Sequence, residues 1–312
     1  MKRVLHIVDS RSYVRSNCFQ HQLAEVMPKV AHVDTKELHE VLGHRLHSAN
    51  RYDLVVSCLK QRTLFRAAQG LQAALGTLPV VVYDQDPWEA FRDGSPFKGA
   101  YKTISSYLNV KTFAVTTKWW ADLIARWGLP STFVRMWVLP EYCSSEPTFD
   151  SRSVAAGFIG ALHPYRRELF EKLEALGTNV IVQGGGLNYA GFREGLSRLQ
   201  CFVHSEDSPV IVEGREFNLN VGLWIKDVEA ASRGCFSIRN RGSDSETYLE
   251  GIKTVMLYDD PSEVPALLDR IQKMDPVERQ SLIDGTVEFI RTANRWQETA
   301  NALVLNSDPG EG

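Results

Sequence analysis

The sequence predicts a two-domain α/β protein in which each domain is a Rossmann-like, doubly wound sheet. Three observations lead to this fold class. Short apolar runs alternate with amphipathic segments, as buried parallel strands alternate with helices. This alternation stops near residue 141 and restarts near residue 154. A chain of 312 residues is also long enough for two mid-sized domains.

The composition is that of an ordinary globular protein. Hydrophobic residues make up 44% of the chain and charged residues 23%, which indicates a substantial core. The net charge of -3 argues against a dedicated nucleic-acid binder but leaves a local basic groove open. Five separated cysteines without a CxxC pair indicate reduced thiols, and no stretch reaches the roughly 20 apolar residues of a membrane span. We therefore expect a cytoplasmic protein without a membrane span.

The first domain is expected over residues 1–145. Its strands are predicted at the apolar runs RVLHIVDS, VAHVD, YDLVVSCL, LPVVVYDQD, TFAVTT and STFVRMWVLP. One helix is expected around residues 16–27, and KWWADLIARWG is predicted to be another, with Gly128 as its C-terminal stop. Residues 141–153 lose apolar periodicity and gain Ser, Pro and acidic residues, so the domain boundary is placed there.

The second domain is expected over residues 151–285. AAGFIGALHPYRRELFEKLEALG is predicted to form a strand, a turn and a helix, and NVIVQGGG a strand that ends in a glycine loop. LQCFVHS, CFSI and TVMLYDD supply further strands, and residues 223–234 and 262–273 are predicted helices. From about residue 277 the chain is expected to be helical to residue 304, before a polar tail at 305–312.

Functional residues are expected at the carboxyl ends of the strands, where open α/β sheets bind ligands and helix N-termini attract anions. The clearest candidate is FIGALHPYRREL, because Gly160 permits a close turn and Arg166 and Arg167 fall in the first turns of the next helix. Two guanidinium groups there would bind a diphosphate. The alternative is a solvated helix face on which both arginines form ion pairs with Glu168 and Glu171.

A second candidate lies in LWIKDVEAASRGCFSI, where Lys226 and Glu229 are three residues apart and share a helix face. A lysine suits phosphate charge and a carboxylate suits ribose hydroxyls. The same pair is also open to interpretation as a surface salt bridge. Gly185, in the glycine loop of VIVQGGG, marks a third strand end of this domain.

The second half of the chain resembles the nucleotide-binding domain of GT-B glycosyltransferases, particularly CgeB-like proteins and their relatives near glycosyltransferase family 4. The resemblance rests on FIGALHPYRREL, VIVQGGG, KDVEAASRG and TVMLYDDPSEVPALLDRI and covers roughly residues 154–275. It implies GT-B architecture, a nucleoside-diphosphate sugar as donor substrate and no separate cofactor. It also implies that a C-terminal helix, residues 286–304, packs on the first domain.

By the same resemblance, Glu229 binds the donor ribose, and Lys226 with Arg166 or Arg167 faces the diphosphate. One position departs from the pattern. Family-4 enzymes usually carry another glutamate about two helical turns before this one, where NLNVGLW places Val221, with Asn218 and Asn220 as the nearest polar residues. This departure leaves open a GT-B-like binding protein that has lost transfer activity.

Three further positions have more than one interpretation. Asp84 and Asp86 match the metal-binding pattern of GT-A enzymes, but two Rossmann-like halves favour acceptor-side groups or turn residues before Pro87. Asp9 is a candidate general base of an inverting enzyme or a helix cap. His163 is a candidate donor to a phosphate or to the transferred sugar.

These patterns predict a glycosyltransferase of the hexosyltransferase class, which moves a sugar from its donor to an acceptor hydroxyl with retention and without a metal. The acceptor is unknown. An inverting, a metal-dependent or a DNA-modifying transferase stays open. A dehydrogenase is disfavoured because SRSYVRS stands where a GxGxxG loop would follow the first strand.

Overall fold

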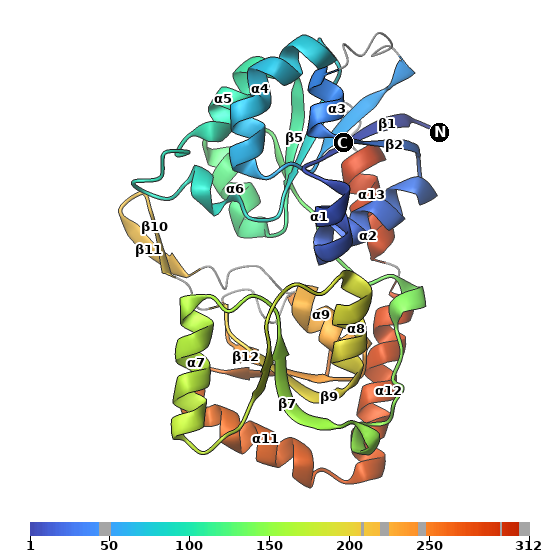
Figure 1. Cartoon of the computed structure of the whole chain (residues 1–312), viewed down its shortest axis with the longest axis vertical. Coiled ribbons are helices and arrows are strands. Elements are labelled where there is room, and N and C mark those ends of the chain that lie inside the picture. Colours follow the sequence, from blue (N-terminus) through green and yellow to red (C-terminus); the bar gives the residue numbers. More distant parts are fainter. Residues whose placement is uncertain (44–50, 207–208, 219–224, 243–247, 294, 306–312) are drawn as a thin grey trace. The chain divides into compact units, whose positions relative to one another are not determined.

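The structure, a computed structural model, describes residues 1–43, 51–206, 209–218, 225–242, 248–293 and 295–305 (Figure 1). The chain forms two compact units, each with its own parallel sheet. The first unit comprises Met1–Met136, Val210–Phe217 and Arg295–Gly312, and the second comprises Trp137–Pro209 and Asn218–Asn294. The predicted fold class, two doubly wound α/β domains, is confirmed.

The sheet of the first unit contains six described strands, all parallel, in the order β2-β1-β3-β4-β5-β6. Their bounds are β1 Arg3–Val8, β2 His32–Glu37, β3 Leu54–Ser57, β4 Val80–Asp84, β5 Val110–Val115 and β6 Ser131–Phe133. The helices that connect them are α1 Arg11–Ser16, α2 Cys18–Val26, α3 Leu38–Gly43, α4 Gln61–Leu75, α5 Ala100–Tyr107 and α6 Lys118–Arg126. As predicted, α6 ends just before Gly128, which adopts φ 75°.

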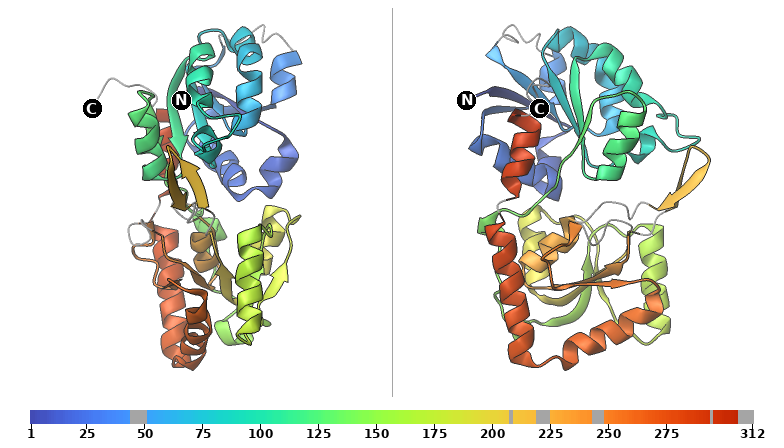
Figure 2. Two further views of the ribbon diagram at one scale, coloured as in Figure 1. Left: turned by 90° about the vertical axis from the view of Figure 1, so that its left-hand side faces the viewer. Right: turned by 180° about the vertical axis from the view of Figure 1, so that it is seen from behind.

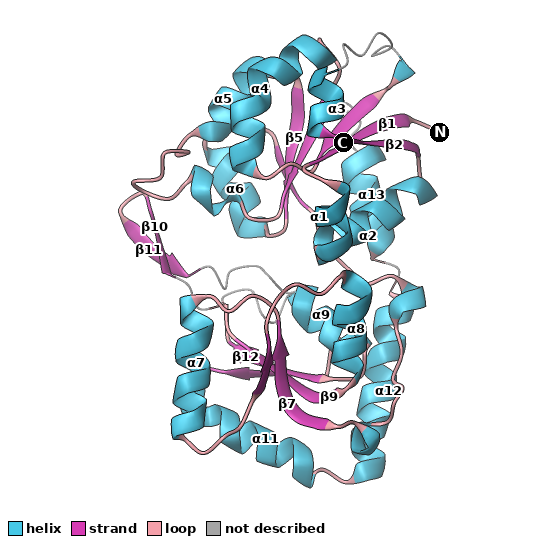
Figure 3. Ribbon diagram, viewed as in Figure 1, coloured by secondary structure: helices cyan, strands magenta, loops and turns pink. Residues whose placement is uncertain are grey.

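The sheet of the second unit contains five described strands, also parallel, in the order β13-β12-β9-β7-β8. Their bounds are β7 Val154–Ile159, β8 Ile181–Gln183, β9 Leu199–His204, β12 Phe236–Asn240 and β13 Val255–Tyr258. The helices are α7 Pro164–Ala175, α8 Tyr189–Ser197, α9 Ile225–Ser232, α11 Val264–Lys273 and α12 Pro276–Thr292. Figure 3 shows these helices packed around the strands.

Both sheets are wound in the same way. The first strand of each unit, β1 or β7, lies inside the sheet; the chain adds one strand on one side of it and then crosses back to the other. The winding direction therefore reverses between β1 and β3 and between β7 and β9. Ligands of doubly wound sheets bind beyond the strands' carboxyl ends at such a reversal. Each unit thus has one expected ligand position of its own.

Apolar β-branched and aromatic residues account for the strands. All five residues of β4, Val-Val-Val-Tyr-Asp, are buried, as expected for a central parallel strand with both faces covered. In the second unit, Phe158, Ile159 and Phe202 of neighbouring strands pack with Leu196 of α8 in one core cluster. These cores hold the strand ends in place.

The second unit begins at Trp137, before the boundary expected within residues 141–153. The Trp137 indole donates to the carbonyl of Ile290 in α12 (2.8 Å). Arg152 donates to the carbonyls of Leu199 (2.9 Å) and Arg233 (2.8 Å), both in the second unit. Polar contacts therefore fix this segment, which lacks the apolar periodicity used to place the boundary.

Two segments late in the chain group with the first unit. Strands β10 Pro209–Val212 and β11 Arg215–Asn218 form a hairpin (Figure 2), whose residues 210–217 belong to that unit. The Asp93 N–H donates to Ile211 (2.8 Å), and the Asp93 carboxylate accepts from Gly214 N–H (2.7 Å). These contacts explain why the hairpin lies outside the unit that its sequence position suggested.

The expected continuous helix to residue 304 is wrong. Helix α12 ends at Thr292 in the second unit, and a separate helix, α13 Trp296–Ala300, follows in the first unit with a π-helical turn at Asn301–Leu305. The chain passes from the second unit to the first between these two helices. Only the part from residue 295 onward groups with the first unit, and residues 306–312 of the predicted tail lie outside the described chain.

Candidate functional site

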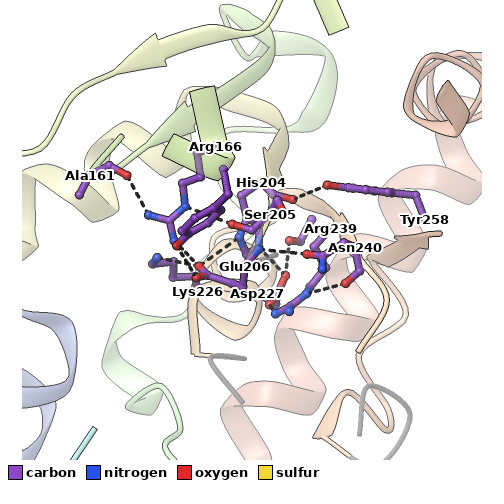
Figure 4. Close-up of polar contacts among 12 residues, drawn as sticks. Ala161, Arg166, His204, Ser205, Glu206, Lys226, Asp227, Arg239, Asn240 and Tyr258 are labelled. Atoms are coloured by element: carbon purple, nitrogen blue, oxygen red, sulfur yellow. Dashed lines mark hydrogen bonds and ion pairs between the residues drawn. The ribbon is translucent and has the colours of Figure 1, made fainter. Parts of the chain in front are cut away.

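Polar side chains gather at the carboxyl ends of β7, β9 and β12 in the second unit (Figure 4). Arg166, in the first turn of α7, connects the loops that follow β7 and β9. Its guanidinium donates to the carbonyls of Ala161 (2.8 Å) and Ser205 (3.1 Å) and forms an ion pair with Glu206. Arg166 therefore joins the two sides of the position where the winding direction reverses.

Glu206 is the centre of this group. Its carboxylate, 2% exposed, accepts from Arg166, from Lys226 Nζ (2.9 Å) and from the Tyr165 hydroxyl (3.2 Å). The Asn240 side chain accepts from the Glu206 N–H (3.0 Å). Two cations thus share one buried carboxylate. Arg166 is buried, whereas the Lys226 side chain is 21% exposed and is the cation that a ligand can reach.

A second buried carboxylate, Asp227, lies next to this group. It accepts from Arg239 Nη1 (2.8 Å) and Ser237 Oγ (2.6 Å), and His204 Nε2 lies 3.0 Å from Asp227 Oδ1. The other ring nitrogen of His204, Nδ1, is 3.6 Å from Glu206 Oε1. His204 therefore bridges the two carboxylates, and Arg239 and Asp227 are fully buried together.

The electrostatics of these carboxylates follow from their partners. Burial alone would raise both pKa values, because it disfavours the charged form. For Glu206, the charges of Lys226 and Arg166 and the nearby His204 ring outweigh burial and hold the pKa well below its usual range. For Asp227, Arg239 and His204 outweigh burial and lower the pKa to about 2. Both groups are therefore carboxylates at neutral pH.

The glycine loops predicted at Gly160 and Gly185 lie side by side. A Cβ added at Gly185 would stand 3.9 Å from the backbone nitrogen of Ala161, and Gly160 adopts φ 150°. His163 is the N-cap residue of α7 and is exposed, with its ring stacked on Tyr165 at 5.7 Å. The structure therefore brings Gly160, Gly185 and His163 together near the N-terminus of α7, close to Arg166.

Two other predicted residues of this unit, Arg167 and Glu229, differ from Arg166 and Lys226 in their surroundings. Arg167 is exposed and lines a different cavity of about 520 Å³ beside α7, with Phe170, Glu171 and Val180 among the lining residues. Adjacent helical residues point about 100° apart, so Arg166 and Arg167 face different surroundings. Glu229 is buried in α9, whereas Lys226 is partly exposed. Asn220 and Val221 lie outside the described residues, as does the side chain of Asn218.

In the first unit, the Asp9 carboxylate accepts from the backbone N–H of Lys60 (2.9 Å), the residue before α4. The Asp84 carboxyl accepts from the Tyr101 hydroxyl (2.7 Å) and from Asp86 N–H (2.9 Å). Burial raises the Asp84 pKa to about 6, although both hydrogen bonds lower it. The contact with Asp86 N–H is that of an Asx-turn, one of the two roles that the sequence suggested.

Among the described residues, no three or more His, Cys, Asp or Glu side chains are arranged to hold a metal ion. The described helices also include none with the length and apolar character needed to cross a bilayer.

Sequence reasoning missed Glu206, His204, Asp227 and Arg239. A signal for the first two was present, because HSE follows the apolar run LQCFV at a strand's carboxyl end. Asp227 and Arg239 carried no comparable signal, since each lies inside a helix or strand and finds its partner only in the folded chain.

No family model matches the sequence, and no curated protein matches it in sequence either. Solved structures do match in three dimensions. HepE of Anabaena, in complex with UDP and glucose, superposes with a TM-score of 0.68 at 11% identity, covering 97% of this chain and 99% of that one. An alpha-glucosyltransferase in complex with UDP-glucose and DNA containing an abasic site gives 0.64 at 9% identity, with coverage of 97% and 99%.

Sucrose-phosphate synthase from Thermosynechococcus elongatus gives a TM-score of 0.59 at 10% identity, covering 96% of this chain and 97% of that one. At such low identity the likeness concerns the fold. Because it extends over nearly the whole of each chain, it includes both sheets. The chain therefore has the two-domain fold of the GT-B glycosyltransferases.

Proposed function

We propose that the chain is a hexosyltransferase that moves a sugar from a UDP-sugar, bound by the second unit, to a hydroxyl group of an acceptor. One observation carries the proposal. Glu206 holds Lys226 at the carboxyl end of the sheet, beside the N-terminus of α7 and two glycine loops. A cation next to helix N–H groups is suited to a diphosphate. HepE was solved in complex with UDP and glucose, and the alpha-glucosyltransferase in complex with UDP-glucose. These complexes support UDP as the nucleotide.

In the proposed reaction, the acceptor hydroxyl oxygen forms a bond to the anomeric carbon of the donor. The bond from that carbon to the diphosphate breaks, and its electron pair stays on the diphosphate. The hydroxyl proton passes to the leaving phosphate in the retaining, metal-independent reaction that we favour. Lys226 and the N–H groups at the start of α7 stabilise the growing negative charge.

The remaining residues have supporting roles in this proposal. Arg166 is a positioning residue, because its buried guanidinium holds Glu206, which in turn holds Lys226. His163 at the exposed start of α7 donates to the phosphate or the transferred sugar, and Glu229 binds the ribose. For Asp9, the contact with Lys60 N–H favours a capping role over that of a general base. A diphosphate contact of Arg167 stays a prediction.

Within the GT-B fold, the motifs FIGALHPYRREL and KDVEAASRG favour a place near the CgeB-like and family-4 enzymes. The two units of the fold would then divide the substrates, with the acceptor bound by the first. Donor binding can therefore be tested with substitutions in the second unit, and acceptor binding with substitutions in the first.

The test is release of nucleoside diphosphate from UDP-, GDP- and dTDP-sugars, with EDTA or with Mn²⁺. We expect slow hydrolysis of one UDP-sugar in EDTA. Lys226→Ala should lower the rate by roughly 10²-fold, the order of losing one donor to a developing oxyanion. Lys253→Ala, an exposed lysine of the same unit, is the matched control. Binding without hydrolysis would favour the inactive GT-B-like protein, and a requirement for Mn²⁺ would favour a metal-dependent enzyme.

A further inference from the structure

The first unit contains a cavity of about 330 Å³ that the proposed donor chemistry does not use. It lies where β3 and β4 end and α4 begins, and its volume is within the range of roughly 300–1,000 Å³ typical of small-molecule pockets. Its lining includes Gln20, Lys60, Gln61, Asp84, Asp86 and Glu89.

The interior of this cavity has unused hydrogen-bonding capacity. Gln20 and Gln61 are 4% and 5% exposed. Gln20 Nε2 donates to the carbonyl of Cys58 (3.1 Å), but Gln20 Oε1 and both amide atoms of Gln61 have no hydrogen-bond partner among the described residues. Buried side-chain amides are nearly always hydrogen-bonded, so these atoms indicate a polar ligand.

Asp84 adds a carboxyl group to the same lining. Its two oxygens accept from Tyr101 and from Asp86 N–H, and each carboxyl oxygen has a further lone pair available. Amides and a carboxyl group together suit the hydroxyl groups of a sugar-like ring. An apolar ligand would leave these groups without partners.

The cavity lining includes two cations. Arg62 is paired with Glu89, whereas Lys60 Nζ lies 4.2 Å from the centre of the Tyr13 ring, at the N-terminus of helix α4. Helix α4 starts at Gln61 without an acidic residue in its first turn. The Asp9 carboxylate accepts from the N–H of Lys60, the residue before the helix, and not from the N–H groups of the first turn. Among the acidic lining residues, Glu89 is paired with Arg62 and Asp84 is buried, while Asp86 is exposed.

The distribution of charge along the chain supports an anionic ligand for this unit. The first unit, Met1–Met136 with Val210–Phe217 and Arg295–Gly312, contains 20 Lys and Arg against 16 Asp and Glu, a formal charge of +4. The second unit contains 15 against 22, a charge of -7. The total of -3 therefore hides a basic first part and an acidic second part. Such asymmetry indicates that the basic part meets an anionic partner.

We propose that this cavity binds the acceptor and that the acceptor carries phosphate. A hydroxylated ring enters the cavity against Gln20, Gln61 and Asp84, and the adjoining phosphate lies at Lys60 and the first N–H groups of α4. The inference rests on the proposed function, since it makes the cavity the acceptor site of that reaction. Two sources share this chemistry, a phosphorylated sugar and a nucleotide unit of a nucleic acid strand.

Binding to the full chain tests the proposal without any transfer step. One arm compares glucose 6-phosphate with glucose by calorimetry. The other compares a labelled single-stranded DNA 12-mer with an uncharged peptide nucleic acid of the same sequence by anisotropy. We expect one phosphate-bearing probe to bind at least tenfold more tightly than its uncharged counterpart, and the arm in which it does so identifies the source.

The variants locate the binding. Lys60→Gln should lower the affinity for the phosphate-bearing probe at least tenfold and leave the affinity for its uncharged counterpart unchanged. Gln61→Leu should lower the affinity for both probes of that arm. Arg126→Gln, which removes an exposed charge on α6, should change neither by more than twofold.

Three results would overturn the inference: neither phosphate probe binds, the uncharged probes bind as tightly, or Lys60→Gln has no more effect than Arg126→Gln. UDP binding is measured on the same samples. If phosphate probes bind and UDP does not, the proposed donor function fails and the anion site stands. If UDP binds and the phosphate probes fail, only the acceptor inference falls.

Discussion

In the second unit, the buried carboxylates of Glu206 and Asp227 each contact a cation, whereas the buried carboxyl group of Asp84 in the first unit contacts a hydroxyl and an amide N–H. The pKa consequences are opposite. Cations lower the pKa of Glu206 and Asp227, and burial raises that of Asp84 to about 6. In the second unit, Glu206 and Asp227 hold cationic side chains of that unit, whereas Asp84 in the first unit lines a cavity beside buried amide groups.

The largest expected effect comes from breaking a buried pair. Asp227→Ala would leave Arg239 buried and charged without its carboxylate, which should cost about 3–5 kcal/mol of unfolding free energy. Urea denaturation measures it. Asp269→Ala, which removes an ion pair whose partners are both more than half exposed, is the control and should change little. If the two variants lost equal unfolding free energy, the buried pair would stabilise the fold no more than an exposed pair.

The next effect is a dependence on pH that is specific to the first unit. The folded-state pKa of Asp84 is raised from an ordinary 3.8 to about 6, so the folded state binds a proton more tightly than the unfolded state. The contribution of Asp84 to the free energy of unfolding is therefore most favourable below about pH 4 and is lost as the pH rises to about 6. Over this window wild type should lose roughly 2–3 kcal/mol that Asp84→Asn does not lose.

Urea titrations at pH 4 and pH 7 give this difference, with Asp122→Asn as an exposed control on α6. The Asp227 carboxylate should behave in the opposite way, because its pKa is lowered to about 2. Its contribution is present above about pH 4 and is lost as pH falls toward 2. If the free energy of unfolding changed with pH in the same way for wild type and Asp84→Asn, the pKa of Asp84 would not be raised and the contrast with Glu206 and Asp227 would be wrong.

A smaller effect is expected at the glycine loop of the second unit. Gly160 has φ 150°, and an added Cβ would lie 3.1 Å from the ring of Phe158. Gly160→Ala should therefore cost about 1–3 kcal/mol. Gly185→Ala is the matched control, because its nearest neighbour would be 3.9 Å away. Thermal unfolding compares the stability of the two variants. An equal loss of stability would show that the backbone conformation at Gly160 does not require glycine.

Much of the fold could be predicted from the sequence. Apolar runs such as VVVYD in the first unit and CFVH in the second indicate buried parallel strands, and such runs predicted both sheets. The unit boundaries could not be placed in this way. Residues 137–153 are fixed by Trp137 and Arg152 through hydrogen bonds to distant carbonyls, and the 210–217 hairpin is held by Asp93. Such contacts leave no local pattern.

The candidate site was predictable in part. The strand-end rule located Gly160 and Arg166, and helical spacing located Lys226; the structure brings the three to one region. It gave no indication that Glu206 would pair with both cations, because β9, α7 and α9 meet only in the folded chain. Whole-chain charge was misleading for a related reason, since opposite charges in the two parts cancel.

The most direct test of the donor site is calorimetric titration of UDP into wild type, Lys226→Ala and Lys253→Ala. If Lys226 meets the diphosphate, UDP should bind wild type and Lys253→Ala alike, and Lys226→Ala at least tenfold more weakly, a loss of about 1.4 kcal/mol or more. Equal UDP affinity in all three proteins, or no UDP binding by any of them, would contradict a donor site built around Glu206 and Lys226.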